Sequence, residues 1–181
     1  MKLMTSRLLI RPIAHDDSES VFAYRKNKEV NKYQGWIPES LPEVTEFINK
    51  TAREPDLPET WFQLVIIENA SGRLMGDIGL HFFGIRNEQV EIGCTLHQDF
   101  QGKGFATEAL ESIITFLFTE LNKHRIIASI DPENLSVIRL LERTGFQKEA
   151  HFRKSLFLND QWVDDVIFAM LRTDWKNSSN F

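Results

Sequence analysis

A single cysteine, Cys94, occurs in the 181-residue sequence, which excludes a disulfide framework and a cysteine-based metal site. The five histidines show no metal-ligand spacing, so we predict no metal. No apolar run approaches membrane-spanning length, and the apolar stretch near the N terminus is too short for a secretory signal. The chain has no excess of basic residues, with 21 Lys and Arg against 26 Asp and Glu, unlike a nucleic-acid-binding protein. These absences predict a cytoplasmic protein without nucleic-acid or membrane partners.

The sequence does contain enough apolar residues for one sizeable core, since 42% of it is hydrophobic and 14 residues are Phe. It shows no internal repeat, low-complexity segment or linker, so we predict a single domain over residues 1–181. The core is expected from about residue 5 to residue 175, followed by a polar tail at 176–181. The net charge of −5 favours a cationic substrate such as an amine or a basic peptide.

Hydrophobic periodicity and turn residues predict a mixed α+β arrangement. Asp16 with Glu19, and Ser40 with Glu43, resemble capping boxes at the starts of the first two helices. The expected strands are 7–12, 61–67, 74–80, 89–96, 125–130, 146–158 and 161–171, and the expected helices are 16–26, 40–53, 106–121 and 134–144.

The segment Gln101–Ala106, which reads Gln-Gly-Lys-Gly-Phe-Ala, connects a predicted strand to a strongly periodic helix. Two glycines let so short a turn curl tightly, so that its amide N–H groups converge at the positive end of the helix dipole. That arrangement suits a phosphate group, which Lys103 could also reach as a point charge. The spacing matches neither the Walker A motif nor the dinucleotide-binding glycine motif. A tight connection that binds no ligand is the alternative.

A second candidate follows the strand predicted at 125–130, where Pro132 ends the strand and Asn134 and Ser136 come next. As isolated residues, Asn134 and Ser136 are expected to cap the helix that follows. The functional alternative is that both side chains project from the end of the strand into the same cleft as the glycine loop.

These stretches resemble the GCN5-related N-acetyltransferase (GNAT) superfamily. Residues 101–106 are similar to its Gln/Arg-x-x-Gly-x-Gly/Ala motif, and residues 5–12 resemble the opening strand of its ribosomal-protein N-terminal acetyltransferase (Rim) branch. The resemblance covers residues 5–175 and implies a mostly antiparallel, twisted sheet that splays in the middle, flanked by about four helices. Further segments match the branch in order: Met75–Leu80, Glu91–Gly93, Asn134–Ser136, Thr144–Phe146 and Trp162–Asp164.

The resemblance implies an acetyl-CoA site. In the family the pyrophosphate lies on amides of the glycine loop, which here comprises Gln101, Gly102, Lys103, Gly104, Phe105, Ala106 and Thr107. The pantetheine arm pairs like an added strand with the strand before the loop, here Cys94, Thr95 and Leu96. Asn134 would hold the arm, and Arg139 or Arg143 would meet phosphate, unless these helix arginines are simply solvated.

Acetylation of an amine requires removal of a proton from the amine, donors to the oxyanion and an acid near the departing thiolate. We expect Glu91 to deprotonate the amine through water, with a solvated strand-end carboxylate as the alternative. Ser136 is the candidate that protonates or hydrogen-bonds the CoA sulfur, a role compatible with helix capping. Many family members place a tyrosine where this chain has Leu141. The two tyrosines, Tyr24 and Tyr33, lie instead in the N-terminal helical region.

The resemblance therefore implies an N-acetyltransferase that moves acetyl from acetyl-CoA directly to a primary amine, either a protein N terminus or a small amine. Cys94 is expected to belong to the core, since no histidine motif supports it as an acyl-accepting nucleophile. Trp36 is expected either to line the acceptor side of the cleft or to belong to the core. The alternative functions are a non-catalytic CoA sensor or structural domain, and a nucleotide-phosphate binder. A homodimer is left open.

Overall fold

The computed structural model describes residues 1–158 and 160–178, in which the strands form one sheet with the order β1-β2-β3-β4-β5-β6-β8-β7. The strands are β1 (Leu3–Met4), β2 (Leu8–Pro12), β3 (Thr60–Glu68), β4 (Leu74–Phe83), β5 (Gln89–Leu96), β6 (Arg125–Ile130), β7 (Gln147–Leu158) and β8 (Gln161–Leu171). The helices are α1 (Ser18–Arg25), α2 (Leu41–Lys50), α3 (Phe105–Thr119), α4 (Leu135–Arg143) and α5 (Arg172–Ser178), with short 3-10 turns η1 (His15–Asp17) and η2 (Gln98–Phe100).

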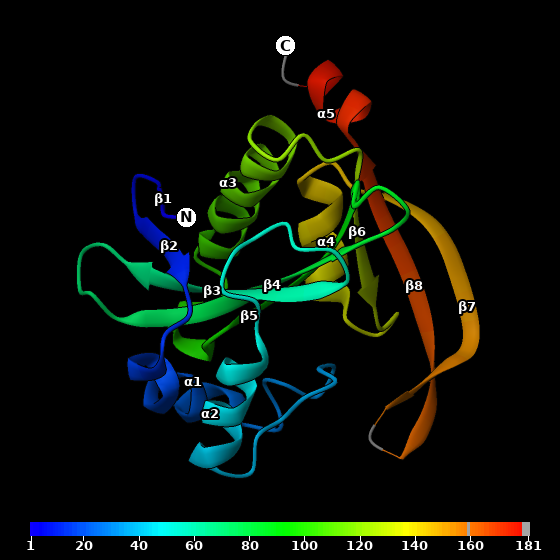
Figure 1. Ribbon diagram of the computed structural model, residues 1–181. Helices are drawn as coiled ribbons and strands as arrows, with labels where there is room; N and C mark the ends of the chain where they lie inside the picture. Colours follow the sequence, from blue (N-terminus) through cyan, green and yellow to red (C-terminus); the bar gives the residue numbers. More distant parts are fainter. Residues whose placement is uncertain (159, 179–181) are drawn as a thin grey trace.

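Helices cover both faces of the sheet, with α1 and α2 on one side and α3 and α4 on the other (Figure 1). The apolar side chains of β3 contribute to both layers, because successive side chains of a strand point to opposite faces of the sheet. Leu64 and Ile66 join the larger core with α3 and α4, while Val65 packs with Val21 and Ile48 of the opposite layer. The long β7–β8 hairpin reaches down to the level of α1 and α2, beside their layer (Figure 1).

The sheet is antiparallel except where β5 meets β6. These two strands pair in parallel through only three residue pairs, Gln89–Glu91 with Arg125–Ile127. Beyond Glu91, β5 continues to Leu96 along β4 alone. The sheet therefore splays between β5 and β6, which confirms the mixed α+β fold expected from the sequence.

The predicted bounds of β5, β6 and β8 agree with the structure residue for residue. Helix α3 also begins within one residue of its predicted start and buries the expected stripe through Ala109, Ile113 and Leu117. The prediction missed β1, both 3-10 turns and α5. The predicted polar tail began at residue 176, whereas α5 continues to Ser178, and residues 179–181 lie outside the described part of the chain.

The capping box proposed for Asp16 and Glu19 is wrong. The turn η1 precedes α1, and the Asp17 carboxylate there accepts hydrogen bonds from the Ala14 amide at 2.8 Å and from Arg11 at 2.7 and 2.8 Å. The spacing of residues in the sequence could not identify Asp17 as the carboxylate that acts here, because its partner Arg11 lies on β2.

Glu43 does reach back over the start of α2. It accepts hydrogen bonds from the Ser40 hydroxyl at 2.9 Å and from the Glu39 amide at 3.0 Å. The helix ends at Lys50, three residues before the predicted end. Within the described ranges, no helix combines the length and the apolar character that crossing a membrane demands.

Candidate functional site

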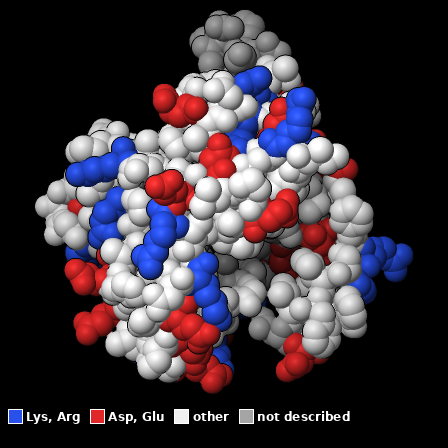
Figure 2. Space-filling view, in the orientation of Figure 1, with Lys and Arg blue, Asp and Glu red and all other residues white. Residues whose placement is uncertain are grey.

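A cavity of about 1060 Å³ opens where β5 and β6 diverge. Its walls come from β5, the glycine loop, the first turns of α3 and α4, the connection between α1 and α2, and the β7–β8 hairpin. Figure 2 shows the surface hollowed between the lower lobe and the hairpin on the right. Segments that are far apart in the sequence therefore face one another across a single space.

The glycine loop curls as the sequence predicted. Gly102 and Gly104 both have left-handed backbone angles, with φ of 73° and 80°, which side chains other than hydrogen rarely tolerate. Gly104 is the residue before the first turn of α3. Among the described residues, the backbone amides of residues 102–107 have no hydrogen-bond acceptor. The loop thus presents free donors at the positive end of the helix dipole.

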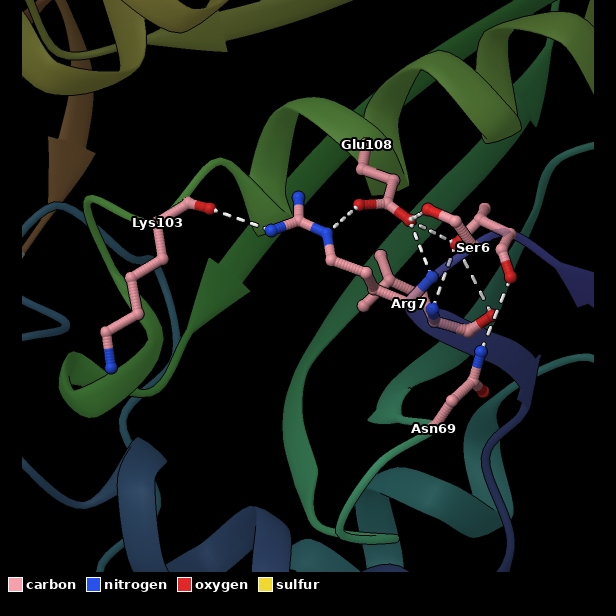
Figure 3. Close-up of polar contacts among 7 residues, drawn as sticks. Ser6, Arg7, Asn69, Lys103 and Glu108 are labelled. Atoms are coloured by element: carbon pink, nitrogen blue, oxygen red, sulfur yellow. Dashed lines mark hydrogen bonds and ion pairs between the residues drawn. The ribbon is translucent and has the colours of Figure 1, made fainter.

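Most loop residues line the cavity, but Lys103 does not. Its ammonium group donates to the Asp99 carbonyl oxygen at 2.7 Å, and Figure 3 shows the side chain directed away from Arg7 and Glu108. The suggestion that Lys103 reaches a phosphate therefore gains no support from its position. Gln101 anchors the loop to β5 instead, since its amide group donates to the Leu96 carbonyl at 2.9 Å. The loop residues that line the cavity are Gln101, Gly102, Gly104, Phe105, Ala106 and Thr107.

The start of α4 contributes Asn134 and Ser136, which both line the cavity. Asn134 is the residue that caps α4, because its Oδ1 accepts hydrogen bonds from the Val137 amide at 3.4 Å and from the Ser136 hydroxyl at 2.9 Å. The Asn134 Nδ2 group has no acceptor within the described chain. One side chain therefore both caps the helix and offers a donor to the cavity.

The two candidate arginines on α4 differ in position. Arg143 lines the cavity and donates to the Thr107 hydroxyl at 2.9 Å, which places its charge beside the first turn of α3. Both side chains are exposed, but Arg139 does not line the cavity. The geometry favours Arg143, so the assignment of Arg139 to the cofactor site remains a prediction without structural support.

The splayed end of β5 carries Cys94, Thr95 and Leu96 along the cavity wall. Burial raises the pKa of the Cys94 thiol to about 12, and the nearby Asp77 carboxylate raises it further than burial alone would. The thiol is therefore neutral at physiological pH and a poor nucleophile. The Thr95 hydroxyl oxygen is buried and has no hydrogen-bond partner among the described residues.

Glu91 is the last residue of β5 that pairs with β6, and it lines the cavity. Burial raises the pKa of its carboxyl group above the ordinary value, with His81 acting to lower the pKa and Asp165 acting to raise it. The His81 ring lies 3.9 Å from the carboxylate and is stacked between Trp61 and Phe83. A carboxylate with a raised pKa is a stronger base than a solvated one.

The sequence analysis gave Tyr33 no catalytic role, although the family resemblance puts the segment from Tyr33 to Trp36 on the acceptor side of the cleft, and it did not single out His81. The Tyr33 hydroxyl donates to the Glu133 carbonyl at 3.2 Å and its side chain lines the cavity, although the two residues are 100 positions apart. No local pattern signals such a contact. Trp36 lines the cavity and also stacks on Phe47 with ring centroids 4.3 Å apart, and its place on the acceptor side stays a prediction.

Carboxylates are numerous along the cavity. Three basic residues also line it: Arg25, which is neutralised by the buried Asp77 at 2.6 Å, Lys32, and Arg143, which lies beside the glycine loop. Figure 2 shows acidic side chains on both sides of the hollow and basic ones to its left. In the described segments, no three His, Cys, Asp or Glu side chains are grouped as a metal site would require. The lining carboxylates are Glu29, Glu91, Asp131 and Asp164.

Known proteins resemble this chain over its whole length. Residues 7–147 match the family model described as an acetyltransferase (GNAT) domain. The chain is 32% identical to the uncharacterized N-acetyltransferase YnaD of Bacillus subtilis over 179 residues, which cover 97% of this chain and 99% of that protein. A crystal structure of a GNAT-family acetyltransferase from Bacillus anthracis superposes with a TM-score of 0.86 at 28% identity, covering 96% and 99% of the two chains.

Two relatives have named acceptors. A spermidine N(1)-acetyltransferase of Vibrio cholerae is 28% identical over 177 residues, or 97% of this chain and 99% of that protein. The [ribosomal protein uS5]-alanine N-acetyltransferase of Escherichia coli is 37% identical over 84 residues, or 46% and 43% of the two chains. The second relative agrees with the resemblance to the Rim branch.

Proposed function

Because the chain belongs to the GNAT acetyltransferase family, we propose that its cavity holds acetyl-CoA and an amine together and transfers the acetyl group directly between them. The chain is an acetyl-CoA-dependent N-acetyltransferase, as its family and its named relatives are. The comparisons give no support to the non-catalytic alternative. The observation that carries the proposal is that the free loop amides line the same cavity as Glu91 and Ser136.

The residues present suit the cofactor. The free amides of residues 102–107 and the Arg143 guanidinium would receive the diphosphate. The edge of β5 beyond Glu91, which pairs with no other strand on the β6 side, and the Asn134 Nδ2 group would receive the amides of the pantetheine arm. These groups come from β5, the glycine loop and α4, which all line the same cavity.

Glu91 would act on the acceptor. An amine reaches the enzyme largely as an ammonium ion, and only the neutral amine attacks a thioester carbonyl. We assign Glu91 to accept the amine proton through water, since its raised pKa makes it a better base than a free carboxylate. The amine nitrogen then bonds to the carbonyl carbon, the carbon–sulfur bond breaks, and no acyl-enzyme on Cys94 is needed.

Ser136 would act on the leaving group. Its hydroxyl lines the cavity and hydrogen-bonds Asn134, which fixes the orientation of both. We assign the serine hydroxyl to hydrogen-bond the departing sulfur, because Leu141 has no proton to give and is almost fully buried. Tyr33 is a second candidate. Each hydroxyl already donates one hydrogen bond, Ser136 to Asn134 Oδ1 at 2.9 Å and Tyr33 to the Glu133 carbonyl at 3.2 Å, so either would have to turn from its partner to reach the sulfur.

The acceptor is proposed to be a cationic primary amine. Four carboxylates line the cavity, and Trp61 contributes a half-exposed ring that can stack over a cation. One relative acetylates spermidine and another an N-terminal alanine, and both acceptors are primary amines with a positive charge. The cytoplasmic location, the lack of nucleic-acid and membrane partners, and any homodimer stay predictions from the sequence.

The test is thiol release from acetyl-CoA with purified protein. A panel of spermidine, an N-terminal alanine peptide and a neutral amide would be compared, and products identified by mass. We expect turnover with at least one of the two amines and none with the amide. Cofactor binding measured by calorimetry but no turnover on any amine would contradict the catalytic proposal.

A further inference from the structure

The segment Thr5–Arg7, just before β2, lies against the glycine loop and the first turn of α3. Figure 3 shows its polar groups converging on Glu108 of that turn. The Glu108 carboxylate accepts hydrogen bonds from the Thr5 hydroxyl at 2.5 Å, the Ser6 hydroxyl at 3.1 Å and the Arg7 amide at 3.0 Å. Asn69 secures the other side of the segment by donating from its backbone to the Arg7 carbonyl at 2.9 Å.

The Arg7 side chain reaches further than the rest of the segment. Its Nε donates to Glu108 Oε2 at 2.5 Å, and its Nη1 donates to the Lys103 carbonyl oxygen at 3.1 Å. The guanidinium also lies over the Phe105 ring, 4.4 Å from the centroid. One planar side chain thus contacts the loop, the helix start and the carboxylate between them.

The contact with the Lys103 carbonyl has a consequence for the neighbouring amide. The carbonyl of Lys103 and the N–H of Gly104 belong to one planar trans peptide unit, so they point in opposite directions. A carbonyl held on Arg7 therefore fixes the direction of the Gly104 N–H. Because Gly104 rotates freely about φ, this unit could otherwise turn over and present a carbonyl oxygen to an anion.

Arg7 also balances a charge. Burial acts to raise the pKa of Glu108, but hydrogen bonds from Thr5, Arg7 and Ser6 outweigh it and lower the pKa to about 2. The group is therefore an anion at neutral pH, within one turn of the amides that would receive the diphosphate. Without Arg7, this anion would repel a phosphate ligand.

We propose that Arg7 is a positioning residue, which holds the Lys103–Gly104 peptide unit and neutralises Glu108 so that the loop accepts a diphosphate. The inference rests on the proposed binding of acetyl-CoA at this loop. Arg7 acts on the cofactor through the loop and does not touch the reacting atoms. Its loss should weaken the use of the diphosphate part of the cofactor and leave the chemistry at the thioester largely intact.

The experiment compares two acetyl donors, acetyl-CoA and S-acetylpantetheine, of which only the first has a diphosphate. The measured quantity is the ratio of kcat/KM for the two donors, which a partly unfolded sample does not alter. We expect Arg7→Gln to lower this ratio about tenfold, mainly through KM for acetyl-CoA. Arg86→Gln is the matched control, since it removes an exposed arginine paired with Glu88 away from the loop, and its ratio should equal that of the wild type.

Arg7→Lys distinguishes the hydrogen bonds of Arg7 from its positive charge. It also provides a second test if Arg7→Gln folds poorly. Lysine keeps the positive charge but cannot bond two acceptors in a plane, so we expect its ratio to fall nearly as far. A wild-type ratio in either substitution would overturn the positioning role of Arg7. A wild-type enzyme that uses both donors equally well would instead refute binding of the diphosphate at this loop.

Discussion

At the end of the cavity beside α3, the groups that face inward are main-chain amides of residues 102–107, whereas beside α1 and α2 they are side chains such as Glu91 and Trp61. The first end depends on backbone conformation and tolerates many side chains, provided that the two glycines remain. The second end depends on the chemistry of individual residues. Donor recognition and acceptor recognition should therefore respond to different kinds of substitution.

The largest effect is expected from Glu91→Gln, which tests the side-chain end. Loss of the base should lower kcat/KM for the amine about 100-fold near neutral pH, with little change in CoA affinity. Glu91 works only when ionised and its pKa is raised, so wild-type activity should fall as pH drops through that raised pKa. The deficit of the variant should narrow as pH rises and more amine is already neutral.

The measurement is a pH profile of kcat/KM for the wild type, Glu91→Gln and Glu111→Gln, an exposed glutamate on α3 that serves as the control. A Glu91→Gln deficit that stays constant across pH would argue that this residue binds or shapes the site and does not accept a proton.

Gly104→Val tests the backbone end. A side chain at φ of 80° is strained and would displace the loop amides, so we expect CoA to bind at least about tenfold more weakly. Gly72→Val is the control, because Gly72 also has a positive φ, 69°, and lies in a turn with open space around it. Calorimetry with CoA should show the loss in the first variant only. Equal affinities in the two variants would mean that the loop is merely a connector.

A comparison of Ser136→Ala with Tyr33→Phe tests which hydroxyl hydrogen-bonds the departing CoA sulfur. We expect Ser136→Ala to lower kcat about tenfold while CoA affinity stays near that of the wild type. Tyr33→Phe should have a smaller effect on kcat, since the family resemblance gives the role to Ser136. Single-turnover rates at saturating substrates give the comparison, and a larger loss in Tyr33→Phe would move the role to the tyrosine.

Glu108→Gln should have the smallest effect on activity but a distinct effect on acid stability. The Glu108 pKa is about 2 in the fold, below its ordinary 4.5, so its contribution to stability is fully present above pH 4.5. That contribution is lost as pH falls from 4.5 towards 2. Urea unfolding across this range should show the wild-type advantage over Glu108→Gln shrinking, and an advantage independent of pH would contradict the assignment.

The contrast between the two ends also explains what the sequence could predict. The glycine loop, the strand before it and α3 follow from local patterns, because turn geometry and helical periodicity depend on neighbouring residues. The direction of Lys103, the choice of Arg143 over Arg139 and the contact of Tyr33 with Glu133 depend on packing between distant segments. Asp17 was missed for the same reason, since its partner Arg11 lies on β2.

Three residue pairs near Glu91 are the only strand pairing, within the described residues, between the five strands β1–β5 and the three strands β6, β7 and β8. A small rotation of one half of the sheet against the other would therefore turn about this short paired stretch. Leu96 lies five residues beyond it, or about 16 Å at the rise of an extended strand, so the gap there widens or narrows far more than it does at Glu91. Near Glu91, where the reaction is proposed to occur, the two halves of the sheet would move least. Near Leu96, where the nucleotide is proposed to bind, the cavity would open and close.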